Sequence, residues 1–69
     1  MQIILAGSMR PVIAHSETEQ AAGLEILALN GDVFLVVLSG QGMKGLIQDM
    51  QSFLEENPQI AETKSLPRQ

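Results

Sequence analysis

Two apolar segments separated by a turn signal dominate the middle of the chain. Residues 24–29 (LEILAL) and 32–38 (DVFLVVL) flank Asn30-Gly31. This dipeptide suits a type I′ turn because both of its residues tolerate positive φ. The β-branched and aromatic residues of the second segment favour a strand. The pattern predicts a β-hairpin over residues 24–38.

A helical pattern follows the hairpin. Polar side chains occupy one side of the segment, and its apolar side chains recur at the three- and four-residue spacing of one helical face. These apolar residues are Met43, Leu46, Ile47, Met50, Phe53 and Leu54. Asn57-Pro58 ends the segment, because a residue before proline is driven out of the helical conformation. We predict an amphipathic helix over about 42–57, with Ser39 as its N-cap.

The first third of the chain carries weaker signals. An apolar run over residues 1–9 predicts a strand, which Arg10-Pro11 interrupts because proline has no N–H for a central ladder. Residues 11–15 fit a short edge strand, and residues 16–19 have the spacing of a capping box. Residues 10–23 therefore stay open between a strand, a helical turn and a loop.

Together these segments predict an α+β fold. We expect a small antiparallel sheet of three to four strands, with the hairpin at its centre and the C-terminal helix packed on one face. Residues 1–60 would form this single small domain. Residues 61–69 are polar and lack periodicity, so we expect a flexible C-terminal tail.

Side-chain alternation along the hairpin predicts two apolar faces. With a two-residue turn, Val33, Leu35 and Val37 share one face with the even-numbered residues of the first arm, and the helix is expected to cover that face. The opposite face carries Leu27, Leu29, Phe34, Val36 and Leu38. Since one helix covers only one face, we expect self-association through these five residues, most simply as a homodimer. Cover by the N-terminal strand is the competing arrangement.

Composition points the same way. The 69 residues have a formal net charge of −4, and 45% of them are hydrophobic but only 17% are charged. A chain this small buries a modest share of its surface, and without cysteine it has no disulfide to stabilise it. A surface this poor in charge is typical of one that another chain covers.

One glycine-rich motif offers candidate chemistry. Residues 40–45 (GQGMKG) match the glycine pattern of a dinucleotide-binding turn directly after a strand. No parallel strand follows, and 69 residues are too few for a dinucleotide fold, so structural glycines are the simpler interpretation. The alternative is a small-ligand or anion-binding site in this turn, formed by Gly40, Gly42, Met43 and Lys44 at the positive end of the helix.

Other chemical signals are weak. His15, Glu17 and Glu19 make too small a set for a metal site, and no serine has a recognisable triad around it. We therefore expect no enzyme activity, no metal and no cofactor. Four scattered Lys and Arg residues and two Phe residues offer neither a phosphate-binding stripe nor a stacking platform, so nucleic acid is not an expected partner.

No apolar run approaches the length of a membrane span, so we expect no membrane partner either. The sequence predicts a small, non-catalytic, homo-oligomeric protein-interaction or regulatory module in the cytoplasm. Its expected partner is a second copy of itself, with another protein as a further partner.

Overall fold

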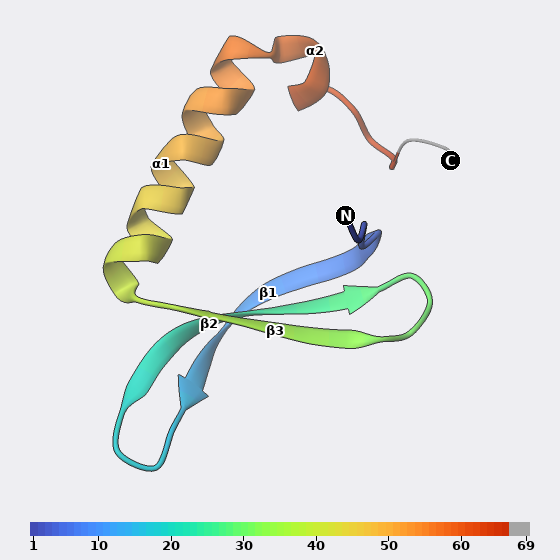
Figure 1. Cartoon of the computed structure of the whole chain (residues 1–69). Coiled ribbons are helices and arrows are strands. Elements are labelled where there is room, and N and C mark those ends of the chain that lie inside the picture. Colours follow the sequence, from blue (N-terminus) through green and yellow to red (C-terminus); the bar gives the residue numbers. More distant parts are fainter. Residues whose placement is uncertain (67–69) are drawn as a thin grey trace.

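Three strands and a long helix make up the fold, described by a computed structural model over residues 1–66 (Figure 1). Strands β1 (Ala6–His15), β2 (Gln20–Ala28) and β3 (Val33–Leu38) form one antiparallel sheet in the order β1-β2-β3. Helix α1 spans Gly40–Glu56, and helix α2 is a single turn over Pro58–Ala61. The predicted α+β class, the small antiparallel sheet and the amphipathic helix are confirmed.

Strand β1 runs through the proline that was expected to interrupt it. Residues 1–5 lie outside the sheet, and β1 continues without a break from Ala6 to His15. The Ser16 N–H donates to the Glu19 carbonyl at 2.9 Å, so Ser16 and Glu19 form a hydrogen-bonded pair. Hydrogen-bonded and non-hydrogen-bonded pairs alternate along antiparallel strands, and this makes Pro11 and Leu24 a non-hydrogen-bonded pair. The nitrogen of Pro11 therefore faces the open edge of β1, where a missing N–H removes no bond to β2.

The capping-box spacing over residues 16–19 forms a hairpin turn and not the start of a helix. The Ser16 hydroxyl accepts a hydrogen bond from the Glu19 N–H at 3.0 Å, and this closes the turn between β1 and β2. Strand β2 begins directly afterwards, at Gln20. The alternative left open for residues 10–23 is thus resolved as two strand segments joined by a tight turn.

The turn between β2 and β3 differs from the predicted type I′ turn. Asn30 has negative φ, and Gly31, at +94°, is the only position with positive φ in the described chain. The Gly31 N–H donates to the Ala28 carbonyl at 3.0 Å, and the Ala28 N–H donates to the Asp32 carbonyl at 2.8 Å. This is a three-residue loop with glycine in the left-handed position. The Asn30 side chain stabilises it by accepting from the Asp32 N–H at 3.0 Å.

The longer loop changes which side chains share a face. Ile26 now pairs with Phe34, and Glu25 pairs with Leu35, so even-numbered residues of β2 face even-numbered residues of β3. One face, called the Phe34 face, carries Met9, Pro11, Ile13, Ala22, Leu24, Ile26, Ala28, Phe34, Val36 and Leu38. The other, called the Leu35 face, carries Arg10, Val12, Ala14, Gly23, Glu25, Leu27, Val33, Leu35 and Val37.

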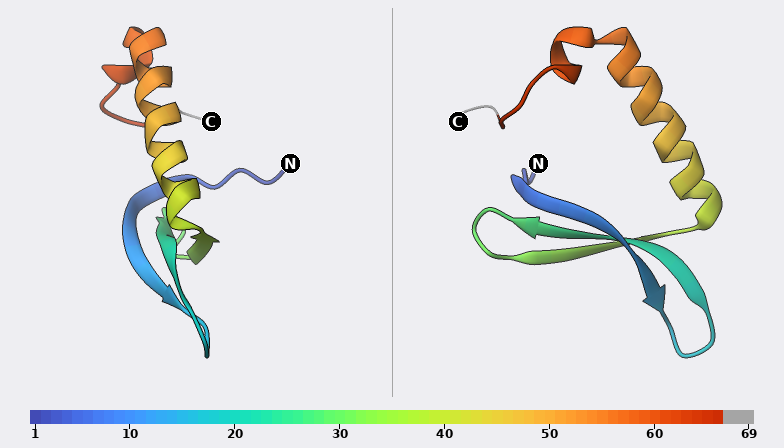
Figure 2. Two further views of the ribbon diagram at one scale, coloured as in Figure 1. Left: turned by 90° about the vertical axis from the view of Figure 1, so that its left-hand side faces the viewer. Right: turned by 180° about the vertical axis from the view of Figure 1, so that it is seen from behind.

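Helix α1 does not pack on either face as expected. It leaves the end of β3 and rises away from the sheet (Figures 1 and 2), and only Met43 and Gly45 along its length are half-buried. Only Ser39 separates β3 from α1. This connection is shorter than the about 2–6 residues usual between a strand and a helix that packs back on its sheet. The radius of gyration is 14.2 Å, whereas a packed domain of this length measures about 11 Å.

Two glycines allow a matched test of the turn. A Cβ added at Gly31 or at Gly45 meets no atom within 4 Å, but only Gly31 has positive φ. We expect Gly31→Ala to lower the free energy of unfolding by about 1–2 kcal/mol, because an L side chain is strained there. Gly45→Ala, in the interior of α1, should raise it by up to about 1 kcal/mol. Urea denaturation compares the two variants. Equal effects would contradict the assigned turn.

Candidate interaction surfaces

The chain buries very little of its apolar surface. Ala14 and Ala28 are the only buried hydrophobic residues in the described part, and no larger side chain reaches the interior. The accessible surface is 6104 Å², whereas a folded monomer of 7.5 kDa exposes about 4,250 Å². The chain thus exposes about 1,850 Å² more than a packed monomer of its size. Three apolar surfaces contribute to this exposed area: the two faces of the sheet and one side of α1.

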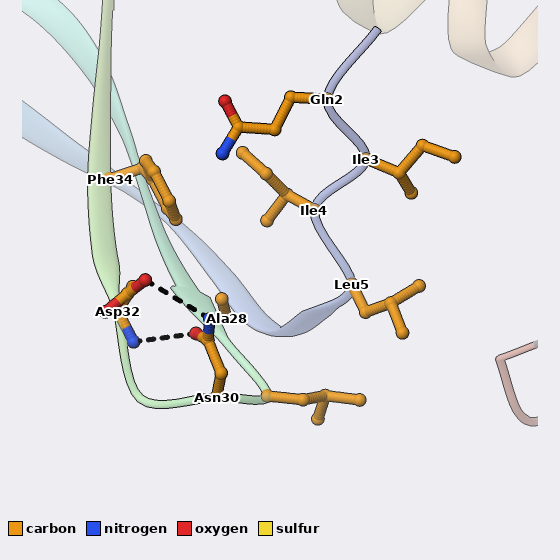
Figure 3. Close-up of a pocket in the computed structure, with 9 residues that line it drawn as sticks. Gln2, Ile3, Ile4, Leu5, Ala28, Asn30, Asp32 and Phe34 are labelled. Atoms are coloured by element: carbon orange, nitrogen blue, oxygen red, sulfur yellow. Dashed lines mark hydrogen bonds between the residues drawn. The ribbon is translucent and has the colours of Figure 1, made fainter. Parts of the chain in front are cut away.

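The Phe34 face is covered at one end by the chain itself. Residues 1–5 lie over the β2–β3 hairpin, where the Leu29 N–H donates to the Leu5 carbonyl at 2.9 Å. The side chain of Ile4 points toward Phe34, and between them lies a groove of about 270 Å³ (Figure 3). The predicted competing cover therefore exists, but it reaches only this end. Farther along the same face, Met9, Ile13 and Val36 are exposed.

The Leu35 face is exposed along β3. Val33 is 63% exposed, Leu35 54% and Val37 59%. Near its centre, the Leu35 side chain lies over Gly23, whose added Cβ would sit 3.0 Å from Leu35 Cδ1 and 3.1 Å from Val12 Cγ2. Because Gly23 has no side chain, the side chains of Leu35 and Val12 can lie this close to its backbone. Within the described residues, the β3 side chains of this face are therefore open to solvent.

One ion pair crosses the Leu35 face. Arg10 Nε lies 2.9 Å from Glu25 Oε1, and the two side chains are 70% and 37% exposed. A pair this exposed contributes at most about 1 kcal/mol, so it aligns β1 with β2 more than it stabilises the sheet. It also makes the Leu35 face the more polar of the two faces.

The third surface is the apolar side of α1, called the helix stripe and made of Met43, Leu46, Ile47, Met50, Phe53 and Leu54. Phe53 is 51% exposed and Met50 54%, although neither has a polar group to hydrate. Near the C-terminal end of the stripe, Asp49, Met50, Phe53 and Leu54 line a shallow hollow. Helix α1 is amphipathic as predicted, but the sheet of the same chain does not cover the helix stripe.

The structure divides the five residues predicted to mediate self-association. Phe34, Val36 and Leu38 lie together on the Phe34 face, Leu27 lies on the Leu35 face, and Leu29 lies in the hairpin loop. The prediction that they form one surface is wrong, because the three-residue loop reverses the parity of β3 relative to β2. Their part in self-association stays a prediction.

Sequence reasoning missed Val33, Leu35 and Val37 as exposed residues, because it placed them under the helix. The available signal was the connection after them. Only Ser39 stands between the end of the apolar strand and the first glycine of the helical segment. That connection is shorter than the about 2–6 residues usual where a helix packs back on the strand it follows.

The glycine-rich motif over residues 40–45 forms the first turns of α1 and not a loop. Ser39 is the N-cap, as predicted, and its hydroxyl accepts a hydrogen bond from the Gly42 N–H at 2.9 Å. The Met43 N–H donates to the Ser39 carbonyl at 2.9 Å. The two amides proposed for an anion therefore have partners within the chain. Gly40 and Lys44 are exposed beside them, and anion binding at this turn stays an untested alternative.

Metal-ligating side chains do not cluster within residues 1–66. No group of three His, Cys, Asp or Glu residues is close enough to hold a metal ion there, and His15, Glu17 and Glu19 are all exposed near the β1–β2 turn. In that same range, no helix is both long and apolar enough to cross a membrane. The features that stand out are the three apolar surfaces.

Comparison with known proteins adds no relative. The chain matches no protein-family model, and neither the curated proteins nor the solved structures contain a significant match.

Ser39 allows a test of the cap. Replacing its hydroxyl in Ser39→Ala leaves the Gly42 N–H without its partner, so we expect the free energy of unfolding to fall by about 1 kcal/mol. Ser39→Asp keeps an acceptor at the cap and should retain stability. Circular dichroism during urea denaturation measures both. If Ser39→Ala unfolds at the wild-type midpoint, the cap assigned to α1 is wrong.

Proposed function

We propose that this chain is a small, non-catalytic protein-interaction or regulatory module that works in the cytoplasm as a homo-oligomer, most simply a dimer. The observation that carries the proposal is the surface that one chain leaves exposed, which includes most of its large hydrophobic side chains. Its excess over a packed monomer, about 1,850 Å² of total area, falls within the range of about 1,000–2,500 Å² that each subunit of an obligate dimer buries.

The kind of surface supports the same proposal. The helix stripe and the Phe34 face each present aliphatic and aromatic side chains at helical or strand spacing. Surfaces of this type gain stability from burial against another apolar surface, at about 25 cal/mol per Å². Soluble monomers rarely leave patches of this size in water. A second copy supplies a helix stripe and a sheet face of matching chemistry.

Stability supports it as well. A core made only of alanine side chains contributes little burial energy to offset the entropy of ordering the chain. In an obligate dimer, the missing core is formed between subunits, and folding is coupled to association. We therefore expect the midpoint of thermal unfolding to rise with protein concentration.

Light scattering coupled to size exclusion tests the proposal directly. We expect a mass of at least twice the 7.5 kDa of one chain at micromolar concentration. A mass of one chain, with a thermal midpoint independent of concentration, would overturn the proposal.

Two neighbouring positions of α1 make a matched test of the helix stripe. Phe53→Glu and Ser52→Glu each add one negative charge to an exposed position, but only Phe53 lies on the stripe. We expect Phe53→Glu to weaken association by about 3 kcal/mol or more, because a carboxylate would be buried without a partner. Ser52→Glu should change it by less than about 0.5 kcal/mol. Sedimentation equilibrium compares them, and equal effects would mean that the stripe stays in water.

A further inference from the structure

The two edges of the sheet differ in how well they are protected from further pairing. On β1, Pro11 removes a donor from the open edge, and the register shifts between Ala6 and Ser8 through a bulge at Gly7. Proline and bulges are common devices that stop an edge strand from adding another strand. Strand β3 (VFLVVL) has no proline, no bulge against β2 and no charged residue.

Backbone groups of β3 are free to pair. The Ala28 N–H donates to the Asp32 carbonyl, so these two residues form a hydrogen-bonded pair. Because such pairs alternate with non-hydrogen-bonded pairs along the hairpin, the backbone groups of Phe34, Val36 and Leu38 are the ones bonded to β2. Val33, Leu35 and Val37 therefore direct their N–H and C=O groups to the open edge. Within residues 1–66, no other backbone segment bonds to this edge.

We propose that β3 pairs edge to edge with β3 of a second copy, antiparallel across a two-fold axis at Leu35, to form a six-stranded sheet. This inference rests on the proposed function and specifies how the two copies meet. In this register Leu35 pairs with Leu35 of the second copy, and Val33 pairs with Val37. Every outward-directed residue of one β3 then faces an outward-directed residue of the other, so their donors and acceptors are satisfied.

The charge at the start of β3 favours the antiparallel direction. Asp32 immediately precedes the strand, and a parallel pair would place it beside Asp32 of the second copy, which is unfavourable. The antiparallel pair places it beside Leu38 instead. Along the pair itself, only apolar side chains meet: Leu35 and the two valines beside it on one face, and Phe34 with Val36 of the second copy on the other.

The geometry also closes the assembly. Joining two copies at β3 hides both unprotected edges at once, and the two outer edges of the new sheet are both β1. Each of those edges carries Pro11 and the bulge at Gly7, so a third copy finds no edge suited to pairing. The result is a closed dimer and not a fibre. A second copy is therefore the occupant that the two edges favour.

Removing one backbone donor tests this pairing. A chemically synthesised chain with an ester in place of the Leu35 amide keeps every side chain but lacks the N–H directed to the open edge. The matched control carries the ester at Ile13, whose N–H points away from β2 at the open edge of β1, since Ile13 and Ala22 are a non-hydrogen-bonded pair. Sedimentation equilibrium measures the dissociation constant of each dimer.

We expect the Leu35 ester to raise the dissociation constant at least about tenfold, because two intersubunit hydrogen bonds are lost per dimer. The Ile13 ester should leave it within about twofold, as expected when no intersubunit bond is lost. Equal effects in a chain that is still dimeric would overturn the β3 pairing but keep the proposed function. A monomeric wild-type chain would overturn both.

Crosslinking gives a second measurement with its own control. The chain has no cysteine, so a single introduced thiol has only its own copy in a second chain to react with. Directly paired residues lie about 5.5 Å apart between Cα atoms, which is within the reach of a disulfide. We expect Leu35→Cys to form a covalent dimer under mild oxidation and Ile13→Cys to remain largely uncrosslinked. A covalent dimer of Ile13→Cys alone would overturn the pairing.

Discussion

The connection between β3 and α1 is the constraint on which the rest of the structure depends. Ser39 is the only residue between the strand and the helix, and its hydroxyl and carbonyl both hold amides of the first helical turn. The helix therefore begins at once and continues in the direction that this cap gives it, away from the sheet. An amphipathic helix that does not pack on its own sheet leaves three apolar surfaces in one small chain.

Those surfaces are the reason why we propose self-association. Within one chain, side chains no larger than alanine are buried, and residues 1–5 cover only the hairpin end of the Phe34 face. In the proposed dimer, pairing at β3 makes the apolar faces of the two sheets continuous. The unequal edges favour this meeting point, because Pro11 protects β1 whereas β3 has no such protection.

Local patterns predicted the elements well. The periodicity of α1 and its Ser39 cap could be predicted because they depend on residues close in sequence, and the hairpin because Asn30-Gly31 lies between two apolar runs. The turn type could not. It depends on the bond between Asn30 and the Asp32 N–H, which favours a three-residue loop and shifts the parity of β3 by one residue.

That single shift explains most of what sequence reasoning misplaced. The predicted surface was divided between two faces. The exposure of Leu35 has a separate cause, because α1 covers neither face of the sheet. The continuous β1 was missed for a different reason. Proline is excluded from central strands but tolerated where its nitrogen faces an open edge. The sequence indicated an edge strand over residues 11–15, but not that this strand continues back through Pro11 to Ala6.

Amide hydrogen exchange of the wild-type protein, followed residue by residue, tests the central claim most directly. In the β3-paired dimer, the N–H groups of Val33, Leu35 and Val37 are bonded to the second copy, so we predict that they exchange as slowly as the amides of β2. The N–H of Ile13, at the open edge of β1, should exchange quickly. If the three β3 amides exchange as quickly as that of Ile13, the edge is open in solution and the account is wrong.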